Sequence, residues 1–205
     1  MYTESLIAFR TRTPCTDPHV MVYRANSRVF SDFPSRCEIP KFISTFDFSC
    51  AFQRSGRLTL FLGDLSYSYG ATSHTARPIS DYPVLGEFVE ELNLVFPFAM
   101  VNSVLLNCYP NGNCHLPLHS DNEPEIDPDS YIFTFSLGRE RIIEFAKNRF
   151  SSPVCKMTLK HGDLIIFSRS SQNKFLHGIP RDNNDVSKEL DSSRLSITFR
   201  RLRAI

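Results

Sequence analysis

The sequence predicts a mainly β fold, an antiparallel sandwich or barrel built from one domain. Short runs rich in β-branched and aromatic residues fill the chain after Pro97, and Gly, Pro, Asn or Asp residues separate many of them. No helical pattern lies between these runs, which argues against a parallel α/β sheet. The chain has 205 residues, of which 41% are apolar, so it is long enough to bury a sizeable core.

The composition limits the classes of function. The chain carries 23 Lys and Arg against 22 Asp and Glu, and a net charge of +1 argues against a broad electrostatic grip on nucleic acid but allows a local basic groove. No apolar run is long enough to span a bilayer. The first residues lack a basic segment followed by an apolar one, so we expect a cytoplasmic protein that is not secreted.

We expect one domain with three segments. Residues 1–57 contain four prolines and little periodicity, which predicts an irregular extension. Residues 58–95 combine short β-type runs with one amphipathic helix, and residues 96–205 form the all-β core.

Two strands and a helix are expected before the core. Residues 57–62 (RLTLFL) predict a short strand that ends at Gly63-Asp64, and residues 65–70 alternate aromatic with small polar residues, as in a strand or hairpin arm. Asp81-Tyr82-Pro83 is typical of a helix start, with Asp81 as the N-cap. An amphipathic helix follows because apolar residues recur at i, i+3, i+4 and i+7, namely Leu85, Phe88, Val89 and Leu92.

Six β-type runs predict the strands of the core. They cover residues 103–109, 131–137, 141–145, 154–159, 164–168 and 194–200. The last run alternates strictly and places Arg194, Ser196, Thr198 and Arg200 on one face. The ordinary interpretation is an edge or surface strand with a solvated polar face. The same face would also line a site for a small dianion well, because a guanidinium binds a carboxylate bidentately.

His119, Asp121 and His177 are candidate metal ligands. Two imidazoles and one carboxylate form the facial triad that holds non-haem Fe(II) with open coordination positions. In an extended segment, residues i and i+2 face the same side, so His119 and Asp121 can bind one ion, and the third ligand must come from a neighbouring strand. A second His-x-Asp, at residues 161–163, is interpreted as a turn because Gly162 suits one. Spacing alone favours the first copy about two to one.

Asn107 and Tyr109 form another polar pair at i, i+2, on an otherwise apolar run. Buried Asn and Tyr side chains need hydrogen-bond partners, so the pair is either a hydrogen-bonding node of the core or the wall of a polar site. On the residues alone, the node is the favoured interpretation.

The stretch from about Asn107 to Arg200 resembles the AlkB group of Fe(II)- and 2-oxoglutarate-dependent dioxygenases. The matching pieces follow one another in a fixed order and are specific as a set. They are Gly63-Asp64 with Tyr67-Ser68-Tyr69, Asn107-Cys108-Tyr109, His119-Ser120-Asp121-Asn122-Glu123, Ser136-Leu137-Gly138, His161-Gly162-Asp163, His177-Gly178, and Arg194 through Arg200. Within the group, the sequence is most similar in character to AlkB-like domains of filamentous plant RNA virus replicase polyproteins.

The resemblance implies a double-stranded β-helix (jelly-roll) core, an N-terminal nucleotide-recognition lid within residues 58–95, and a few helices. It implies three iron ligands, His119, Asp121 and His177. It assigns 2-oxoglutarate binding to Asn107, Tyr109, Arg194 and Arg200, with Arg194 on the distal carboxylate. It places Glu123, Tyr67 and Tyr69 against the substrate base.

The implied reaction is oxidative demethylation of RNA or single-stranded nucleic acid, on bases such as N1-methyladenine and N3-methylcytosine. Fe(II) would react with O2 and 2-oxoglutarate to give succinate, carbon dioxide and a ferryl oxidant, and the hydroxylated methyl group would leave as formaldehyde. An N-methyl group on a Watson–Crick edge is unreachable in a stacked duplex, so the base must be flipped or unpaired. The implied partners are methylated RNA or single-stranded DNA and other domains of a replicase polyprotein in the host cytoplasm, and we expect a monomer.

The sequence departs from the group at three points. It contains no Trp, Leu118 precedes the first metal-ligand candidate, and Ser196 stands where some relatives have Asn. The lid is short and shows no finger for opening a duplex, which favours RNA or single strands as substrate. Glu123 lies in an acidic Pro-rich loop that could simply be solvated, and Tyr67 and Tyr69 could equally pack the lid.

Two other classes of function stay open on the sequence. One is an Fe(II)/2-oxoglutarate hydroxylase of a protein or small molecule, which keeps the metal and co-substrate residues but needs no base-binding residues. The other is a non-enzymatic β-sandwich binding module, in which the His and Arg residues bind no metal.

Overall fold

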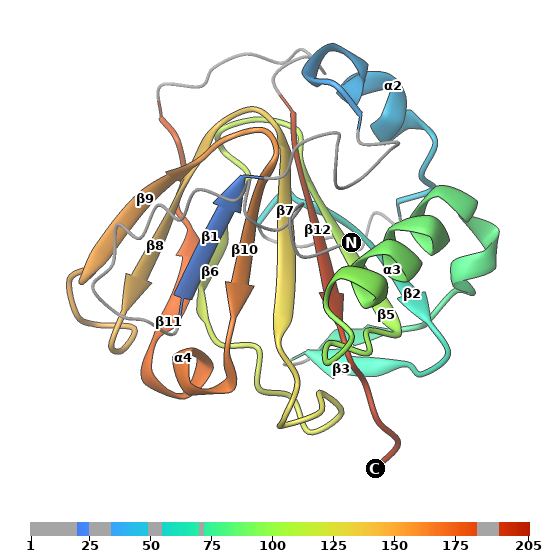
Figure 1. Cartoon of the computed structure of the whole chain (residues 1–205). Coiled ribbons are helices and arrows are strands. Elements are labelled where there is room, and N and C mark those ends of the chain that lie inside the picture. The colour runs from blue at the N-terminus through green and yellow to red at the C-terminus, as the bar shows by residue number, and fades with distance from the viewer. Residues whose placement is uncertain (1–19, 25–33, 49–54, 70–71, 184–192) are drawn as a thin grey trace.

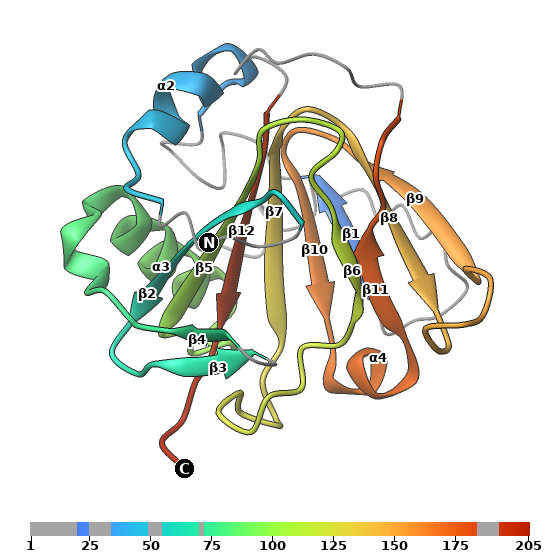
Figure 2. The ribbon, with the colours of Figure 1, turned by 180° about the vertical axis from the view of Figure 1, so that it is seen from behind.

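Two antiparallel β-sheets face each other and form the body of the protein (Figure 1). The structure is a computed structural model, and it describes residues 20–24, 34–48, 55–69, 72–183 and 193–205. The six-stranded sheet has the order β1-β10-β7-β12-β5-β2, and the four-stranded sheet has the order β6-β11-β8-β9. A separate hairpin, β3–β4, lies beside one end of the sheets (Figure 2). The predicted mainly β, double-stranded β-helix architecture is therefore confirmed.

The six-stranded sheet consists of β1 (Val20–Arg24), β2 (Leu58–Gly63), β5 (Ser103–Tyr109), β7 (Ile132–Gly138), β10 (Asp163–Phe167) and β12 (Arg194–Arg200). The four-stranded sheet consists of β6 (Leu116–His119), β8 (Arg141–Ala146), β9 (Cys155–Leu159) and β11 (Leu176–Ile179). The hairpin is β3 (Tyr67–Tyr69) with β4 (Thr72–His74), and the α-helices are α2 (Ile39–Ser44), α3 (Pro83–Val95) and α4 (Arg169–Lys174). Short 3-10 turns cover Arg36–Glu38 and Ile79–Asp81.

The last strand, β12, is a central strand and not the edge strand that its polar face suggested. It pairs with β5 on one side and β7 on the other, and all seven of its residues are buried. Leu195, Ile197 and Phe199 face the main core under α3. Burial of their apolar surface stabilises the fold by about 25 cal/mol per Å². The polar face therefore lies inside the protein, between the two sheets, where charged groups need partners.

Helix α3 covers the outer face of the six-stranded sheet, as Figure 1 shows. It begins at Pro83, as predicted, and buries Leu85, Phe88 and Leu92 on one face. The expected Asp81 cap is wrong, because Asp81 ends a 3-10 turn and Tyr82 occupies the N-cap without a side-chain hydrogen bond. Pro83 starts the helix without that cap because its ring already holds the φ angle of a first helical turn.

Several elements carry no clear signal in the sequence. Strands β6 and β11 have four residues each, and β6 contains a proline while β11 contains a glycine, so neither shows a readable alternation. Strand β1 and helix α2 lie in the segment that we expected to be irregular, whereas the division of the chain into three segments stays a prediction. Among the helices that the structure describes, none has the length and apolar character needed to cross a bilayer.

Two glycine substitutions test this fold with opposite expected signs. Gly138 has φ +81°, and a Cβ atom there would lie 2.3 Å from the backbone oxygen of Ser193, so Gly138→Ala should destabilise the protein by about 2–4 kcal/mol. Gly86 lies inside α3 with only ordinary contact for a Cβ atom, so Gly86→Ala should stabilise it by about 0.5–1 kcal/mol. Urea unfolding of both variants measures the two effects, and equal stabilities would contradict the packing described for β7.

Candidate active site

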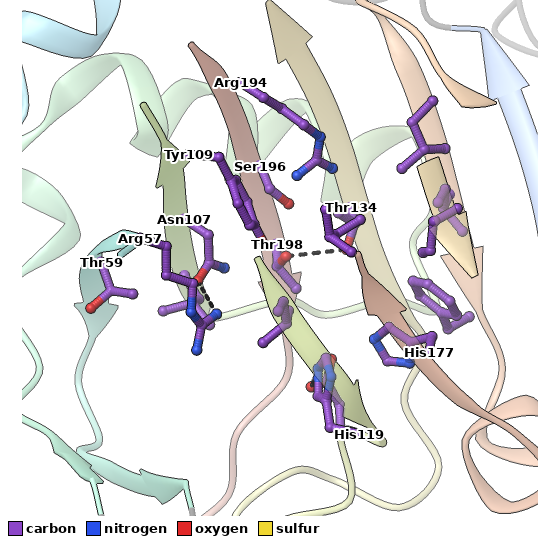
Figure 3. A pocket seen from close by; sticks show the side chains of 18 of the residues that line it. Arg57, Thr59, Asn107, Tyr109, His119, Thr134, His177, Arg194, Ser196 and Thr198 are labelled. Carbon is purple, nitrogen blue, oxygen red and sulfur yellow. Dashed lines mark hydrogen bonds and ion pairs between the residues drawn. The ribbon is translucent and has the colours of Figure 1, made fainter. Parts of the chain in front are cut away.

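A pocket that is open to solvent lies between the two sheets (Figure 3). Alternate residues of β2, β5 and β12 supply one polar wall, because every second side chain of these strands points away from α3. The apolar wall comes from β8 and β9 of the four-stranded sheet and from β10 of the six-stranded sheet, including Ile143, Leu159 and Phe167. A concave site with apolar lining and a few converging polar groups is typical of a small-ligand site.

The three candidate metal ligands converge at one end of this pocket. His119 ends β6 and pairs directly with His177 on β11, so the two imidazole rings lie with their centroids 4.3 Å apart. Asp121 follows two residues after His119, with its Oδ1 atom 3.4 Å from His119 Nε2. All three side chains are buried, and one ligand atom from each lies within 4.8 Å of the other two.

The imidazoles are held in states that suit metal binding. His119 Nδ1 lies 2.9 Å from the carbonyl oxygen of Pro117, and this contact favours the tautomer that donates from Nδ1 and leaves the Nε2 lone pair toward Asp121. The ring of His177 stacks on Phe167, with centroids 4.8 Å apart. Burial, reinforced by the nearby His119 and Arg200 and opposed by Asp121, lowers the pKa of His177 to about 3. At neutral pH this imidazole is therefore uncharged and able to coordinate a metal.

Asp121 is kept ionised by its neighbours. Burial by itself would raise the pKa of its carboxyl group, but the Arg200 guanidinium counteracts burial, and the pKa lies well below its usual value. The Nη2 atom of Arg200 lies 3.0 Å from Asp121 Oδ2. The backbone N–H of Asp121 donates to Oε1 of Gln172, which is 51 residues away on α4. These contacts fix both the charge and the direction of the carboxylate.

Two imidazole nitrogens and a carboxylate oxygen on adjacent extended segments fit a first-row divalent metal such as Fe(II). Three protein ligands on one side leave coordination positions for small molecules. The second His-x-Asp copy lies elsewhere, because Gly162 has φ +85° in a turn and Asp163 Oδ2 accepts from the N–H of Lys160 at 2.7 Å. This agrees with its interpretation as a turn.

Arg194 lies at the other end of the pocket from the two histidines, as Figure 3 shows. Its side chain is only 2% exposed, its Nε donates to Ser136 Oγ at 3.0 Å, and its guanidinium lies over the Tyr109 ring, 5.1 Å from the centroid. Burial lowers its pKa, yet an arginine remains a cation at any relevant pH. Its Nη1 atom is buried and has no hydrogen-bond partner among the described residues, so the site presents an unsatisfied donor to an anion.

Asn107 and Tyr109 both line the pocket, so they are part of its wall. Asn107 is also a hydrogen-bonding node, because its Oδ1 accepts from Nη1 of Arg57 at 2.6 Å (Figure 3). Since Arg57 engages the amide oxygen, Asn107 offers its NH2 group, a donor, to the pocket. Asn107 therefore fits both interpretations, and Tyr109 fits the interpretation as pocket wall.

Of the three residues that we expected to contact a substrate base, the structure describes the side chain of one, Glu123. Glu123 is buried close to Asp121, and burial raises its pKa, reinforced by the Asp121 charge and opposed by Arg200. Glu123 Oε2 has no hydrogen-bond partner among the residues that the structure describes. Tyr67 and Tyr69 are the first and last residues of β3, and the structure describes their backbone but not their side chains.

Among the described residues, sequence reasoning missed four polar residues of the site and its apolar lining. Arg57 and Thr59 stand at i, i+2 where β2 begins, and this spacing, like that of Asn107 and Tyr109, could have marked them as sharing one face. Thr134 Oγ1 lies 3.1 Å from Thr198 Oγ1 across β7 and β12. Gln172 carries no local signal, since its role depends on a contact with a distant loop.

Comparisons with known proteins agree with this geometry. A family model described as "2OG-Fe(II) oxygenase superfamily" matches residues 47–200. The chain is 26% identical over 180 residues to "DNA oxidative demethylase ALKBH2" of Arabidopsis thaliana, covering 77% of this chain and 56% of the relative. It is 31% identical over 156 residues to the human "Alpha-ketoglutarate-dependent dioxygenase alkB homolog 3", covering 70% of this chain and 51% of the relative. The chain thus spans about half the length of the curated relatives that it matches.

One solved structure, titled "The structure of OsALKBH1", superposes with a TM-score of 0.58 at 18% identity, covering 94% of this chain and 100% of that chain. At this identity the match shows the fold alone. The chain belongs to the 2OG-Fe(II) oxygenase superfamily. Membership implies Fe(II) as the metal and 2-oxoglutarate and O2 as co-substrates, and the buried His119, Asp121 and His177 cluster fits such an ion.

Gln172→Met tests whether α4 positions the metal-binding loop. The variant keeps the side-chain length but removes the acceptor for the Asp121 N–H, so we expect metal affinity to fall about 10-fold or more. Titration of Mn(II) into protein that a chelator has freed of metal measures this affinity. Asn173→Met, an exposed change on the same helix, is the matched control. Equal Mn(II) affinity for both variants would contradict a role for Gln172.

Proposed function

We propose that this chain is an Fe(II)- and 2-oxoglutarate-dependent oxidative demethylase that removes N-methyl groups from RNA or single-stranded nucleic acid. The observation that carries the proposal is the presence, at opposite ends of one pocket, of a two-His, one-Asp cluster and a buried guanidinium whose Nη1 atom has no partner among the described residues. Relatives whose names describe DNA oxidative demethylases support the choice of substrate class.

In this proposal His119, Asp121 and His177 hold the iron. Bound iron supplies the redox chemistry that joins O2 and 2-oxoglutarate to oxidation of the methyl group. Arg200 keeps the Asp121 carboxylate ionised, and the apolar wall with Phe167 excludes water from the ligand atoms. The protein residues thus set the geometry and charge of the metal ligands and keep water away from them. No side chain is required as a general acid or base.

The polar wall of the pocket binds 2-oxoglutarate in this proposal. Arg194 pairs with the distal carboxylate through its buried Nη1 atom, while Tyr109 and the NH2 group of Asn107 donate hydrogen bonds to the same diacid. Arg200 lies at the metal end, where the keto-acid group would approach. The separation of Arg194 from the histidines in Figure 3 suits a ligand with an anionic group at each end.

Glu123, Tyr67 and Tyr69 contact the methylated base in this proposal. N1-methyladenine and N3-methylcytosine are cationic, and a carboxylate near the metal would attract them electrostatically. A flipped or unpaired base needs an aromatic face to stack on, and the β3–β4 hairpin carries two tyrosines in its first strand. Formaldehyde and succinate are the expected products.

We also propose that the chain acts as one domain of a replicase polyprotein in the cytoplasm of a host cell, and that this domain is monomeric. A net charge of +1 supports the first part of this proposal, because other domains would then supply further contacts to the nucleic acid.

Arg194→Lys tests the assignment of the diacid site. Lysine keeps the charge but loses the planar fork, so the KM for 2-oxoglutarate should rise about 10- to 100-fold. Steady-state 2-oxoglutarate turnover, and the absorbance that 2-oxoglutarate induces with Fe(II) without oxygen, both report this change. Arg203→Lys is the control, because Arg203 is exposed. An unchanged KM would remove Arg194 from the diacid site.

Mass spectrometry on methylated oligonucleotides tests the activity. With Fe(II) and 2-oxoglutarate, single-stranded RNA or DNA carrying N1-methyladenine or N3-methylcytosine should lose the methyl group and release formaldehyde, and Asp121→Ala should abolish this loss. Single strands should react faster than a matched duplex, because an unpaired base avoids the cost of unstacking. Turnover of 2-oxoglutarate without demethylation of any oligonucleotide would favour a hydroxylase of a protein or small molecule. Absence of Fe(II) binding would favour a non-enzymatic module.

A further inference from the structure

The tip of the β8–β9 hairpin, residues 147–154, is built unlike the rest of the surface. Phe150 is 99% exposed, more than any other large apolar side chain that the structure describes, and Val154 is 52% exposed. A phenyl ring buries a large apolar area when it finds a partner, so such complete exposure is unfavourable in the isolated protein. The ring is therefore available to a ligand.

The tip holds Phe150 outward through its own hydrogen bonds. The Phe150 N–H donates to Asn148 Oδ1 at 2.9 Å, and the Ser151 hydroxyl donates to the Asn148 carbonyl oxygen at 3.1 Å. The Val154 N–H donates to the carbonyl oxygen of Phe145 at 2.8 Å and closes the loop. An Asx-type turn of this kind limits the conformations of the tip, so less entropy is lost when the ring binds a partner.

The hairpin concentrates positive charge in a nearly neutral chain. From residue 146 to residue 160 there are four cations and no acidic residue, whereas the whole chain carries +1. Lys156 pairs with Glu144 at 3.5 Å across the hairpin. At the tip, Lys147 and Arg149 are exposed and form no ion pair with any described residue. Two free cations beside an exposed aromatic ring match the chemistry of phosphates and stacked bases.

The tip also starts next to the candidate metal site. Strand β8 pairs with β11 so that Phe145 lies opposite His177 and Ala146 lies opposite Leu176, and the tip begins at the next residue. Figures 1 and 2 both place the tip at the same end of the sheets as α4 and the β3–β4 hairpin. The loop that follows His119, residues 121–129, is acidic, so the hairpin is the part of this end that attracts a polyanion.

We infer that the hairpin tip is a second contact surface for single-stranded nucleic acid, separate from the base-binding pocket. Phe150 stacks on a base that flanks the methylated one, and Lys147 and Arg149 contact the adjoining phosphates. This inference rests on the proposed demethylase function, since that function brings a strand to this end of the protein. A single strand fits better than a duplex because its bases are free to stack on one exposed ring.

Fluorescence anisotropy with an unmodified, labelled single-stranded RNA tests the inference on the full chain loaded with Mn(II) and 2-oxoglutarate. Phe150→Ala should weaken RNA binding about 5- to 100-fold. Phe150→Trp should keep the wild-type affinity, because tryptophan also offers an aromatic face. The double variant Lys147→Gln/Arg149→Gln should weaken binding and reduce the slope of log affinity against log salt by about 1. The 2-oxoglutarate affinity should stay unchanged in every variant, which shows that the fold and pocket are intact.

Arg36→Gln/Lys41→Gln is the matched control, because it removes the same charge from exposed positions around α2. Unchanged RNA affinity in the tip variants, or an equal loss in the control, overturns the inference. A Phe150 effect confined to duplex DNA, or tip-dependent binding of anionic vesicles without RNA binding, also overturns it. If the wild-type protein demethylates oligonucleotides but the tip variants bind RNA normally, only this inference fails. If tip-dependent RNA binding occurs without demethylation of any oligonucleotide, only the proposed function fails.

Discussion

The buried ion pair between Arg200 and Asp121 is the interaction on which the candidate site depends. A carboxylate removed from water tends to take up a proton, and a protonated Asp121 would be a poor metal ligand. Arg200, at 3.0 Å, reverses that tendency and makes an anionic ligand possible beside two neutral imidazoles. The pair also joins β12 to the loop after β6, so the polar face of one sheet sets the chemistry at the end of the other.

Cationic side chains outnumber anionic ones among the described residues that line the pocket. Arg57, Arg194 and Arg200 line it together with one carboxylate, Asp121. The guanidinia of Arg141 and Arg194 both lie over the Tyr109 ring, 5.7 Å and 5.1 Å from its centroid, so positive charge surrounds the distal end. In the proposed assignment, a diacid at Arg194 and a divalent cation near Asp121 would offset each other's charge, and their binding would be coupled through the same low-dielectric space.

The strands that local pattern predicted best are β5 and β12, two neighbouring strands inside the six-stranded sheet. Strands β5 and β12 begin and end at the predicted residues, because β-branched and aromatic residues on one face must meet α3 while the other face enters the pocket. Strands β6 and β11, which carry the histidines, were not visible as strands. Four residues that include a proline or a glycine hold too little pattern, and their extended conformation comes from pairing with each other.

The sequence by itself determined which residue types share a face and, through the ordered motifs, the family and the identities of the metal-ligand candidates. It did not determine which residues of neighbouring strands pair, because alternation specifies the face of a strand but neither its neighbouring strand nor the register between them. Only the tertiary structure set His177 opposite His119, brought Gln172 to Asp121 from 51 residues away, and turned the Asn107 amide toward the pocket through Arg57. Those contacts depend on sheet pairing between distant segments, which no local stretch of sequence encodes.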